Sequence, residues 1–119
     1  MKTHFLMVLI LALLGFAACL GDKSLDEVDP EAAPAEPVYT EHIAPLMFDY
    51  CDSCHSPDGA RVLGEIRTDT CEELKGNMEI VSEMVFDRQV MPPGGAERMT
   101  SEDQLTLQRW FDQGADCDQ

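Results

Sequence analysis

Residues 51–55 of the chain read CDSCH, a Cys-x-x-Cys-His sequence. Two cysteines three positions apart on a helical turn point the same way, so both thiols can reach vinyl groups on one edge of a porphyrin. The histidine that follows directly can turn a ring nitrogen onto the iron. The sequence therefore predicts one covalently bound haem c, attached through Cys51 and Cys54, with His55 as the first axial iron ligand.

A Cys-x-x-Cys pair has two other common uses, a dithiol redox pair and a zinc site. A dithiol redox pair usually belongs to a strand–helix–strand unit, and no such pattern surrounds residues 51–54. A zinc site needs further ligands, and the remaining cysteines do not form a second Cys-x-x-Cys. Both observations favour haem attachment.

The second axial iron ligand is predicted to be Met91. It lies 36 residues after His55 and directly before two prolines, which stiffen the loop so that a thioether is held at little further cost in entropy. The other candidates are His42, Met47, Met78, Met84 and Met99. Methionines on helix faces are usually core residues, and a histidine on the motif's own helix is more often capping or solvated. An open iron position would instead suit a haem enzyme or a gas sensor.

The folded part is predicted to start near residue 38 and to be mostly α-helical, because apolar residues recur at helical spacing and no strand pattern is present. The expected elements are a helix over residues 41–50, a loop over 56–68, a short helical turn over 70–74, a helix over 77–88, an extended break over 91–95 and a last helix from Thr100 to Gly114. Asn77 and Thr100 are expected to cap the helices that they precede. Residues 38–119 are thus interpreted as one helical domain.

Residues 1–18 have the organisation of a secretory signal peptide. Lys2 precedes an apolar run over residues 5–14, which is too short for a transmembrane helix and is followed by small residues. Residues 16–19 read FAAC and resemble a bacterial lipobox, in which the cysteine is lipidated and becomes the new N-terminus. We therefore expect an exported lipoprotein, anchored to a membrane through Cys19, on the periplasmic or cell-surface side. An ordinary signal peptide with an incidental cysteine is the alternative.

Residues 19–37 are predicted to form a tether between the lipid and the domain. The stretch is rich in acidic residues, proline and alanine and has almost no large apolar side chains. It cannot bury enough surface to offset the entropy lost on ordering, and its prolines favour extended conformations. A loop packed on the domain is the alternative.

Cys71 and Cys117 are left once the lipid and the haem have been assigned their cysteines. Leftover cysteines of a small domain usually pair in an oxidising compartment, so a disulfide between the two is predicted. Free or intermolecular thiols are the alternative. Without haem, the chain would be a disulfide-bonded lipoprotein.

The chain is strongly acidic, with 8 Lys and Arg against 23 Asp and Glu and a formal net charge of −15. A phosphate backbone repels such a surface, which argues against nucleic-acid binding. The charge could steer the protein toward a basic docking patch on a redox partner, or it could serve solubility alone.

Taken together, these features resemble a class I c-type cytochrome domain, and more narrowly the small bacterial lipoprotein cytochromes. Those proteins have I-x-P-L/I and C-x-x-C-H near the start of the domain, and M-P-P-G-G and W-x-x-x-G-A toward its end. The matching residues, which span nearly all of residues 38–119, are Ile43, Pro45, Leu46, Cys51, Cys54, His55, residues 91–95, Thr100, Glu102, Trp110, Gly114 and Ala115. Met99 stands where a leucine is common in that family.

The resemblance implies a helical domain wrapped around one haem, in which the first and last helices cross. It also implies that Trp110 or Phe111 packs against the first helix near Ile43 and Met47. Met91 is the distal ligand by the same resemblance, and no residue is catalytic. The expected function is that of an extracytoplasmic monohaem cytochrome that carries single electrons between redox partners and is not an enzyme.

Overall fold

The structure is a computed structural model that describes residues 29–59 and 66–119. The elements are η1 (Tyr39–Ile43), α2 (Ala44–Tyr50), α3 (Asp52–His55), α4 (Cys71–Gly76), α5 (Met78–Ser82), η2 (Glu83–Asp87) and α6 (Ser101–Asp112). All of the named elements in these two ranges are helical, so the prediction of a mostly α fold is confirmed. None of the described helices is long and apolar enough to cross a membrane. The predicted leader and Cys19 lie outside the described residues.

The first helix runs without a break through η1 and α2 and starts two residues earlier than predicted. Pro45 lies in the first turn of α2 but inside the continuous helix, where it cannot donate the backbone hydrogen bond that another residue would make to η1. At the start of η1, the Val38 N–H donates a hydrogen bond to Nδ1 of His42 at 3.1 Å. His42 thus satisfies a backbone donor at the helix start. This is the capping role that the sequence favours for His42 over iron ligation.

The two predicted helix caps have different outcomes. The Thr100 hydroxyl accepts the Asp103 N–H at 3.1 Å and caps α6 as predicted. Asn77 does not cap α5 with its side chain, which instead donates to the carbonyls of Arg67 and Glu73 at 3.1 and 2.9 Å. The prediction for Asn77 is wrong because its side-chain amide is engaged by the carbonyl of Glu73, in the last turn of α4, and by that of Arg67, which precedes α4.

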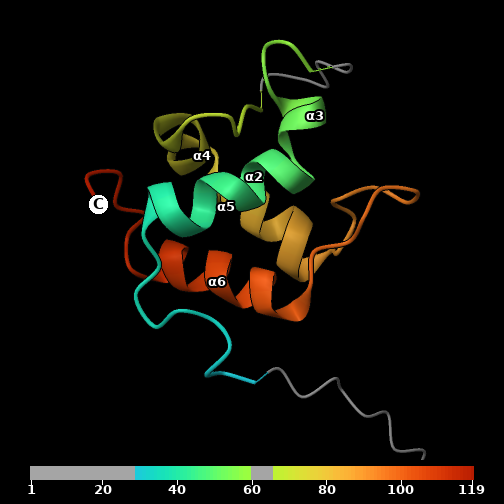
Figure 1. Ribbon diagram of the computed structural model, residues 1–119. Helices are drawn as coiled ribbons and strands as arrows, with labels where there is room; N and C mark the ends of the chain where they lie inside the picture. Colours follow the sequence, from blue (N-terminus) through green and yellow to red (C-terminus); the bar gives the residue numbers. More distant parts are fainter. Residues whose placement is uncertain (1–28, 60–65) are drawn as a thin grey trace, which may run out of the picture.

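The core lies between the first helix, α4, α5 and α6, and Figure 1 shows α6 alongside the first helix. Its largest fully buried side chains are Ile43, Met47, Leu74, Leu107 and Trp110. The ring of Trp110 lies 5.6 Å from the ring of Tyr39 in η1, measured between centroids. The packing of Trp110 against the first helix therefore agrees with what the resemblance implies.

The end of the predicted tether, residues 30–37, packs on α6, and we call it the N-terminal segment. Arg109 on α6 donates to three of its carbonyls, those of Pro30, Ala33 and Pro34, at 3.0, 2.6 and 3.1 Å. Gln113, one turn later, donates to a fourth at 2.8 Å. In Figure 1 the segment runs beneath α6, on the side away from α3. For these residues the packed-loop alternative describes the structure, because α6 supplies donors to backbone carbonyls that the tether's composition does not reveal.

Replacing Arg109 by glutamine is expected to release the N-terminal segment from α6. The substitution removes charge-assisted hydrogen bonds to three carbonyls, and we expect the free energy of unfolding to fall by about 2 kcal/mol. Limited proteolysis of the folded protein should then cut within residues 30–37 faster than in the wild type. Arg88→Gln is the matched control, because Arg88 is exposed and its side chain makes a surface ion pair with Glu83 at 3.6 Å and a weak contact with Met84 Sδ at 3.9 Å. Equal proteolysis of both variants would contradict the prediction.

Candidate functional site

Residues 52–55 of the Cys-x-x-Cys-His sequence form α3, a single helical turn, and Cys51 is the residue with irregular backbone between α2 and α3. The N–H groups of Cys54 and His55 both donate to the Cys51 carbonyl, at 3.0 and 2.9 Å. Both thiols are unpaired and partly buried. The three residues predicted to attach and ligate a haem are therefore held together by local structure.

Two adjoining cavities, of about 150 and 250 Å³, open beside α3. Four residues line both of them: Cys51, His55, Val85 and Met91. We call the combined space the crevice. The first cavity extends under α5 and η2, where its walls include Ile80, Val81 and Met84, and the second is also lined by Tyr50, Cys54 and Pro92. Mostly apolar walls with a few polar groups suit an apolar ligand whose orientation is fixed by a small number of polar contacts.

His55 is held in one orientation by the backbone of Ile66, eleven residues later in the chain. Its Nδ1 lies 3.0 Å from the Ile66 carbonyl oxygen, which can only accept, so Nδ1 carries the proton and donates. In the neutral ring, the lone pair is then on Nε2, the form in which a histidine binds a metal ion. The sequence predicted only a loop here, and no residue pattern marks Ile66 as the acceptor.

The thiol of Cys51 is buried in surroundings that disfavour its thiolate form. Burial raises its pKa to about 12, and the neighbouring charge of Asp52 acts in the same direction. Redox-active cysteines need a thiolate, which a lowered pKa supplies. The dithiol alternative for the Cys-x-x-Cys pair is thus disfavoured by the surroundings of Cys51.

The zinc alternative for the Cys-x-x-Cys pair lacks further ligands within the described residues. No group of three or more His, Cys, Asp or Glu side chains is arranged to hold a metal ion in residues 29–59 and 66–119. A structural zinc site takes four such ligands. The crevice offers two thiols, one imidazole and thioethers, a donor set that can attach and ligate a haem.

Among the candidate distal ligands, Met91 is the methionine that lines both cavities. Met47 is buried in the core and Met78 packs against the core, as predicted for helix-face methionines. Met84 was assigned to the core on the same grounds, but the structure places it on the wall of the first cavity. Helical spacing could not separate the two outcomes, because α5 and η2 have the core on one face and the crevice beside it. Met99 is a core residue that also borders the second cavity.

Tyr50 ties the crevice to the last helix. Its hydroxyl donates to Oδ2 of Asp103, near the start of α6, at 2.9 Å. The hydrogen bond to this carboxylate raises the pKa of Tyr50, with burial as a smaller cause, so the phenol keeps its proton at neutral pH. Because Tyr50 lines the second cavity, this bond fixes one wall of the crevice against α6.

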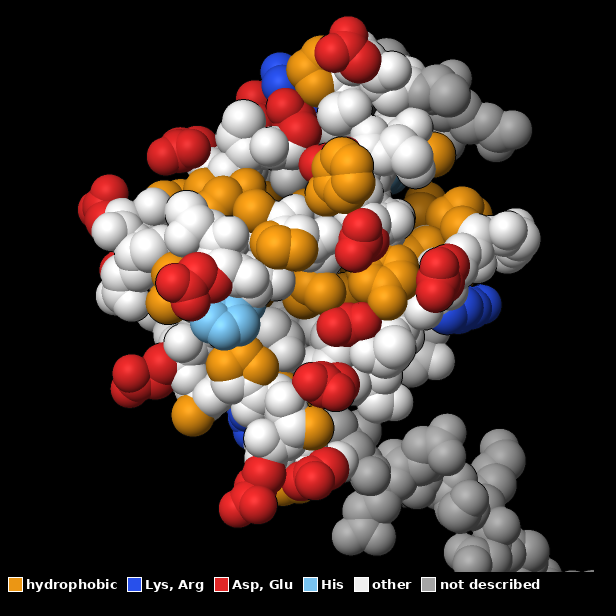
Figure 2. Space-filling model, in the orientation of Figure 1, with side chains coloured by type: hydrophobic (Ala, Val, Ile, Leu, Met, Phe, Trp, Pro, Cys, Tyr) orange, Lys and Arg blue, Asp and Glu red, His pale blue; other side chains and the backbone are white. Residues whose placement is uncertain are grey.

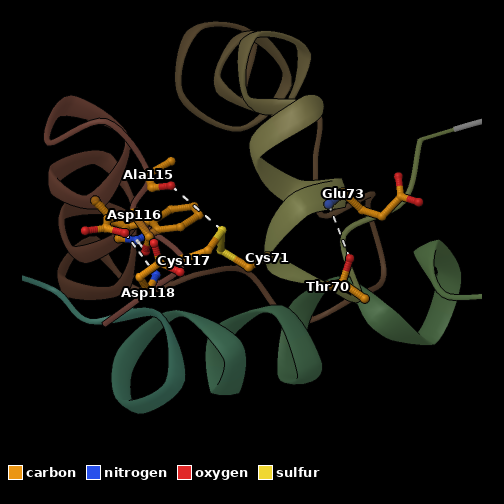
Figure 3. Close-up of a disulfide and its surroundings, with 8 residues drawn as sticks. Thr70, Cys71, Glu73, Ala115, Asp116, Cys117 and Asp118 are labelled. Carbon is orange, nitrogen blue, oxygen red and sulfur yellow. Dashed lines mark hydrogen bonds between the residues drawn. A yellow bond between two sulfur atoms is a disulfide. The ribbon is translucent and has the colours of Figure 1, made fainter.

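Cys71 and Cys117 lie away from the crevice. Their sulfur atoms are 2.02 Å apart and their Cα atoms 5.7 Å apart, and Figure 3 shows the bond between them. Neither cysteine lines either cavity. The bond joins the start of α4 to the C-terminal residues beyond α6, which is the pairing that the leftover cysteines predict.

Comparison with known proteins leaves the crevice as the basis for any functional assignment. No protein-family model, curated protein or solved structure matched the chain. The residues of the crevice fit a covalently attached haem on two observations of the structure. The thiols of Cys51 and Cys54 are free within one helical turn, and the ring of His55 lies beside apolar space with its Nδ1 engaged by the Ile66 carbonyl.

Proposed function

We propose that the chain is an extracytoplasmic monohaem cytochrome c that carries single electrons between redox partners. The observation that supports this most strongly is the convergence of Cys51, Cys54, His55 and Met91 on one apolar crevice. These residues come from α3 and from a loop beyond η2, 36 residues later in the chain. Stabilisation by a disulfide alone does not require two further free thiols and a histidine beside an apolar cavity.

Each residue has a separate task in this proposal. Cys51 and Cys54 would hold the haem by thioether bonds, and His55 Nε2 and Met91 Sδ would ligate its iron from the protein. The bound haem would supply reversible one-electron exchange between the ferrous and ferric states. A thioether ligand favours the ferrous state relative to a second imidazole and so raises the midpoint potential. The apolar walls would limit the access of water to the ring, and in this proposal no side chain takes part in bond making or breaking, so the protein would be a carrier and not an enzyme.

The test is a haem stain on a denaturing gel, after expression together with a cytochrome maturation system. Covalent haem survives denaturation, so the wild-type band should stain, and the Cys51→Ala/Cys54→Ala double variant should not. The same wild-type protein, when oxidised, should show the far-red absorption band of a methionine–iron bond. An unstained wild-type band would contradict the proposal and leave a disulfide-bonded lipoprotein. A stained band with a high-spin spectrum would indicate an open iron position, as in a haem enzyme or gas sensor.

We place the protein outside the cytoplasm, attached to a membrane through a lipid on Cys19, with redox proteins as partners. In bacteria, haem is attached covalently outside the cytoplasm. The proposed haem and the leader sequence therefore both support this placement. Figure 2 shows carboxylates spread over the face that it draws, with few Lys or Arg side chains. Ion pairs within the described residues involve Arg67 and Arg88, and most of the described carboxylates have no cationic partner there. Such a surface fits a partner with a basic docking patch and not a nucleic acid.

Electron transfer from the reduced holoprotein to a basic redox protein is expected to slow on the order of tenfold between about 10 and 150 mM salt. Salt shortens the range over which the carboxylates attract the partner, and so lowers the association rate. Stopped-flow absorbance of the haem measures this rate. An uncharged small-molecule oxidant serves as the control, because its rate should not change with salt. A rate with the basic protein that is independent of salt would contradict steering by the acidic surface.

A further inference from the structure

Residues 66–68, directly after the part of the chain that the structure does not describe, are fastened to α3 by three hydrogen bonds. The Ile66 carbonyl accepts from His55 Nδ1 at 3.0 Å, and the Thr68 N–H donates to the His55 carbonyl at 3.2 Å. The Thr68 hydroxyl donates to Oδ1 of Asp52 at 3.3 Å. Thr68 therefore makes two of the three bonds. The third bond joins the imidazole of His55 to Ile66, which is two residues before Thr68.

The hydroxyl of Thr68 is buried, with 3% of the residue exposed, and Thr68 also lines the first cavity. Thr106 is the other buried polar residue of the described part, and its hydroxyl bonds to a carbonyl of its own helix at 2.9 Å. Thr68 differs because its partner, Asp52, belongs to another element, the turn that carries the Cys-x-x-Cys-His sequence. A buried hydroxyl without a partner is costly, so the Asp52 contact fixes where Thr68 can lie.

We propose that Thr68 is a positioning residue for His55, with Asp52 as its anchor. By holding residues 66–68 against α3, the Thr68 hydroxyl keeps the Ile66 carbonyl on Nδ1 and so sets the orientation and basicity of the imidazole. This inference rests on the proposed function, in which Nε2 of the same ring binds the haem iron. A carbonyl on Nδ1–H makes the imidazole a stronger donor, which stabilises ferric iron and lowers the midpoint potential.

Two variants separate the hydroxyl from the shape of the side chain. Thr68→Val keeps the volume and removes the hydroxyl, whereas Thr68→Ser keeps the hydroxyl and removes a methyl group. Asp52→Ala removes the anchor from the other side, and gives a second route to the same loss if the valine variant folds poorly. Thr106→Val is the matched control, because it deletes a buried threonine hydroxyl on α6 that does not line the crevice.

The experiment uses the holoprotein with two readouts: solvent exchange of the His55 Nδ1–H, followed by NMR in the ferrous state, and the midpoint potential. We expect exchange at least tenfold faster and a more positive potential in Thr68→Val and in Asp52→Ala. Thr68→Ser and Thr106→Val should match the wild type in both readouts. A merely structural role would change stability without moving the exchange rate or the potential.

Two results would overturn the inference: wild-type exchange and potential in Thr68→Val, or an equal change in Thr68→Ser, which would assign the effect to packing. Failure of the proposed function is visible separately, because the wild-type chain would then carry no covalent haem. In that case the Nδ1–H exchange is compared in the haem-free chain. The same order of variants supports the positioning role there, and equal exchange rates in all variants contradict it.

Discussion

Oxidised Met91→Ala holoprotein is expected to lose the far-red absorption band of a methionine–iron bond while keeping its covalent haem. Met91 is the methionine that lines both cavities of the crevice, so its removal leaves the iron without the proposed thioether. Loss of that ligand removes its preference for ferrous iron, and we expect the midpoint potential to fall. Absorption spectra and a redox titration of the same sample measure both effects.

Met84→Ala is the matched control for this experiment. Met84 lines the first cavity, and the N–H groups of Val90 and Met91 both donate to its carbonyl, at 3.0 and 3.3 Å. The segments that carry Met84 and Met91 are therefore held together by backbone hydrogen bonds. If the band persists in Met91→Ala and disappears in Met84→Ala, the assignment of the distal ligand is wrong. If both single variants keep the band, neither methionine ligates the iron.

The sequence was sufficient for those parts of the site that depend on neighbours in the chain. The attachment residues lie on one helical turn, as their spacing predicts, and Thr100 caps the last helix through a bond to Asp103, three residues later. Local backbone geometry determines such contacts, so residue type and spacing carry the information. The packing of Trp110 against the first helix could also be anticipated, but only through resemblance to a known family, and the contact with Tyr39 was not predicted.

Contacts between distant segments could not be predicted in the same way. Arg109 lies within the last predicted helix, where nothing in the sequence marks it as a contact residue. In the structure its guanidinium donates to carbonyls 75 to 79 residues earlier in the chain. Thr68 lies in a stretch with loop composition, yet it holds the carbonyl that orients His55. In both cases a side chain meets a backbone carbonyl or a distant carboxylate, and every residue except proline offers the same backbone groups. A single sequence has no pattern from which to tell which of them is used.

Removing the Cys71–Cys117 bond is expected to lower the free energy of unfolding by about 4 kcal/mol. The bond closes a loop with a sequence separation of 46, and cutting it returns that loop's conformational entropy to the unfolded chain. Single domains are stable by about 5–15 kcal/mol, so the loss is a large fraction of the total. Urea denaturation of the Cys71→Ala/Cys117→Ala holoprotein, followed by far-UV circular dichroism, measures it.

Reduction of the wild type with a thiol reagent distinguishes the bond from the side chains that form it. Thioether bonds to haem resist such reagents, so in the holoprotein reduction acts on Cys71 and Cys117 within the described residues. The reduced wild type and the double alanine variant should lose similar stability, because both open the same loop. Cys71 is 6% exposed, and a larger loss in the variant alone would come from the space left in the core and not from the bond. The far-red band should survive in the oxidised double alanine variant, since neither cysteine lines the crevice. A loss below about 1 kcal/mol on reduction would show that packing around α4 and α6 holds the C-terminal residues without the bond.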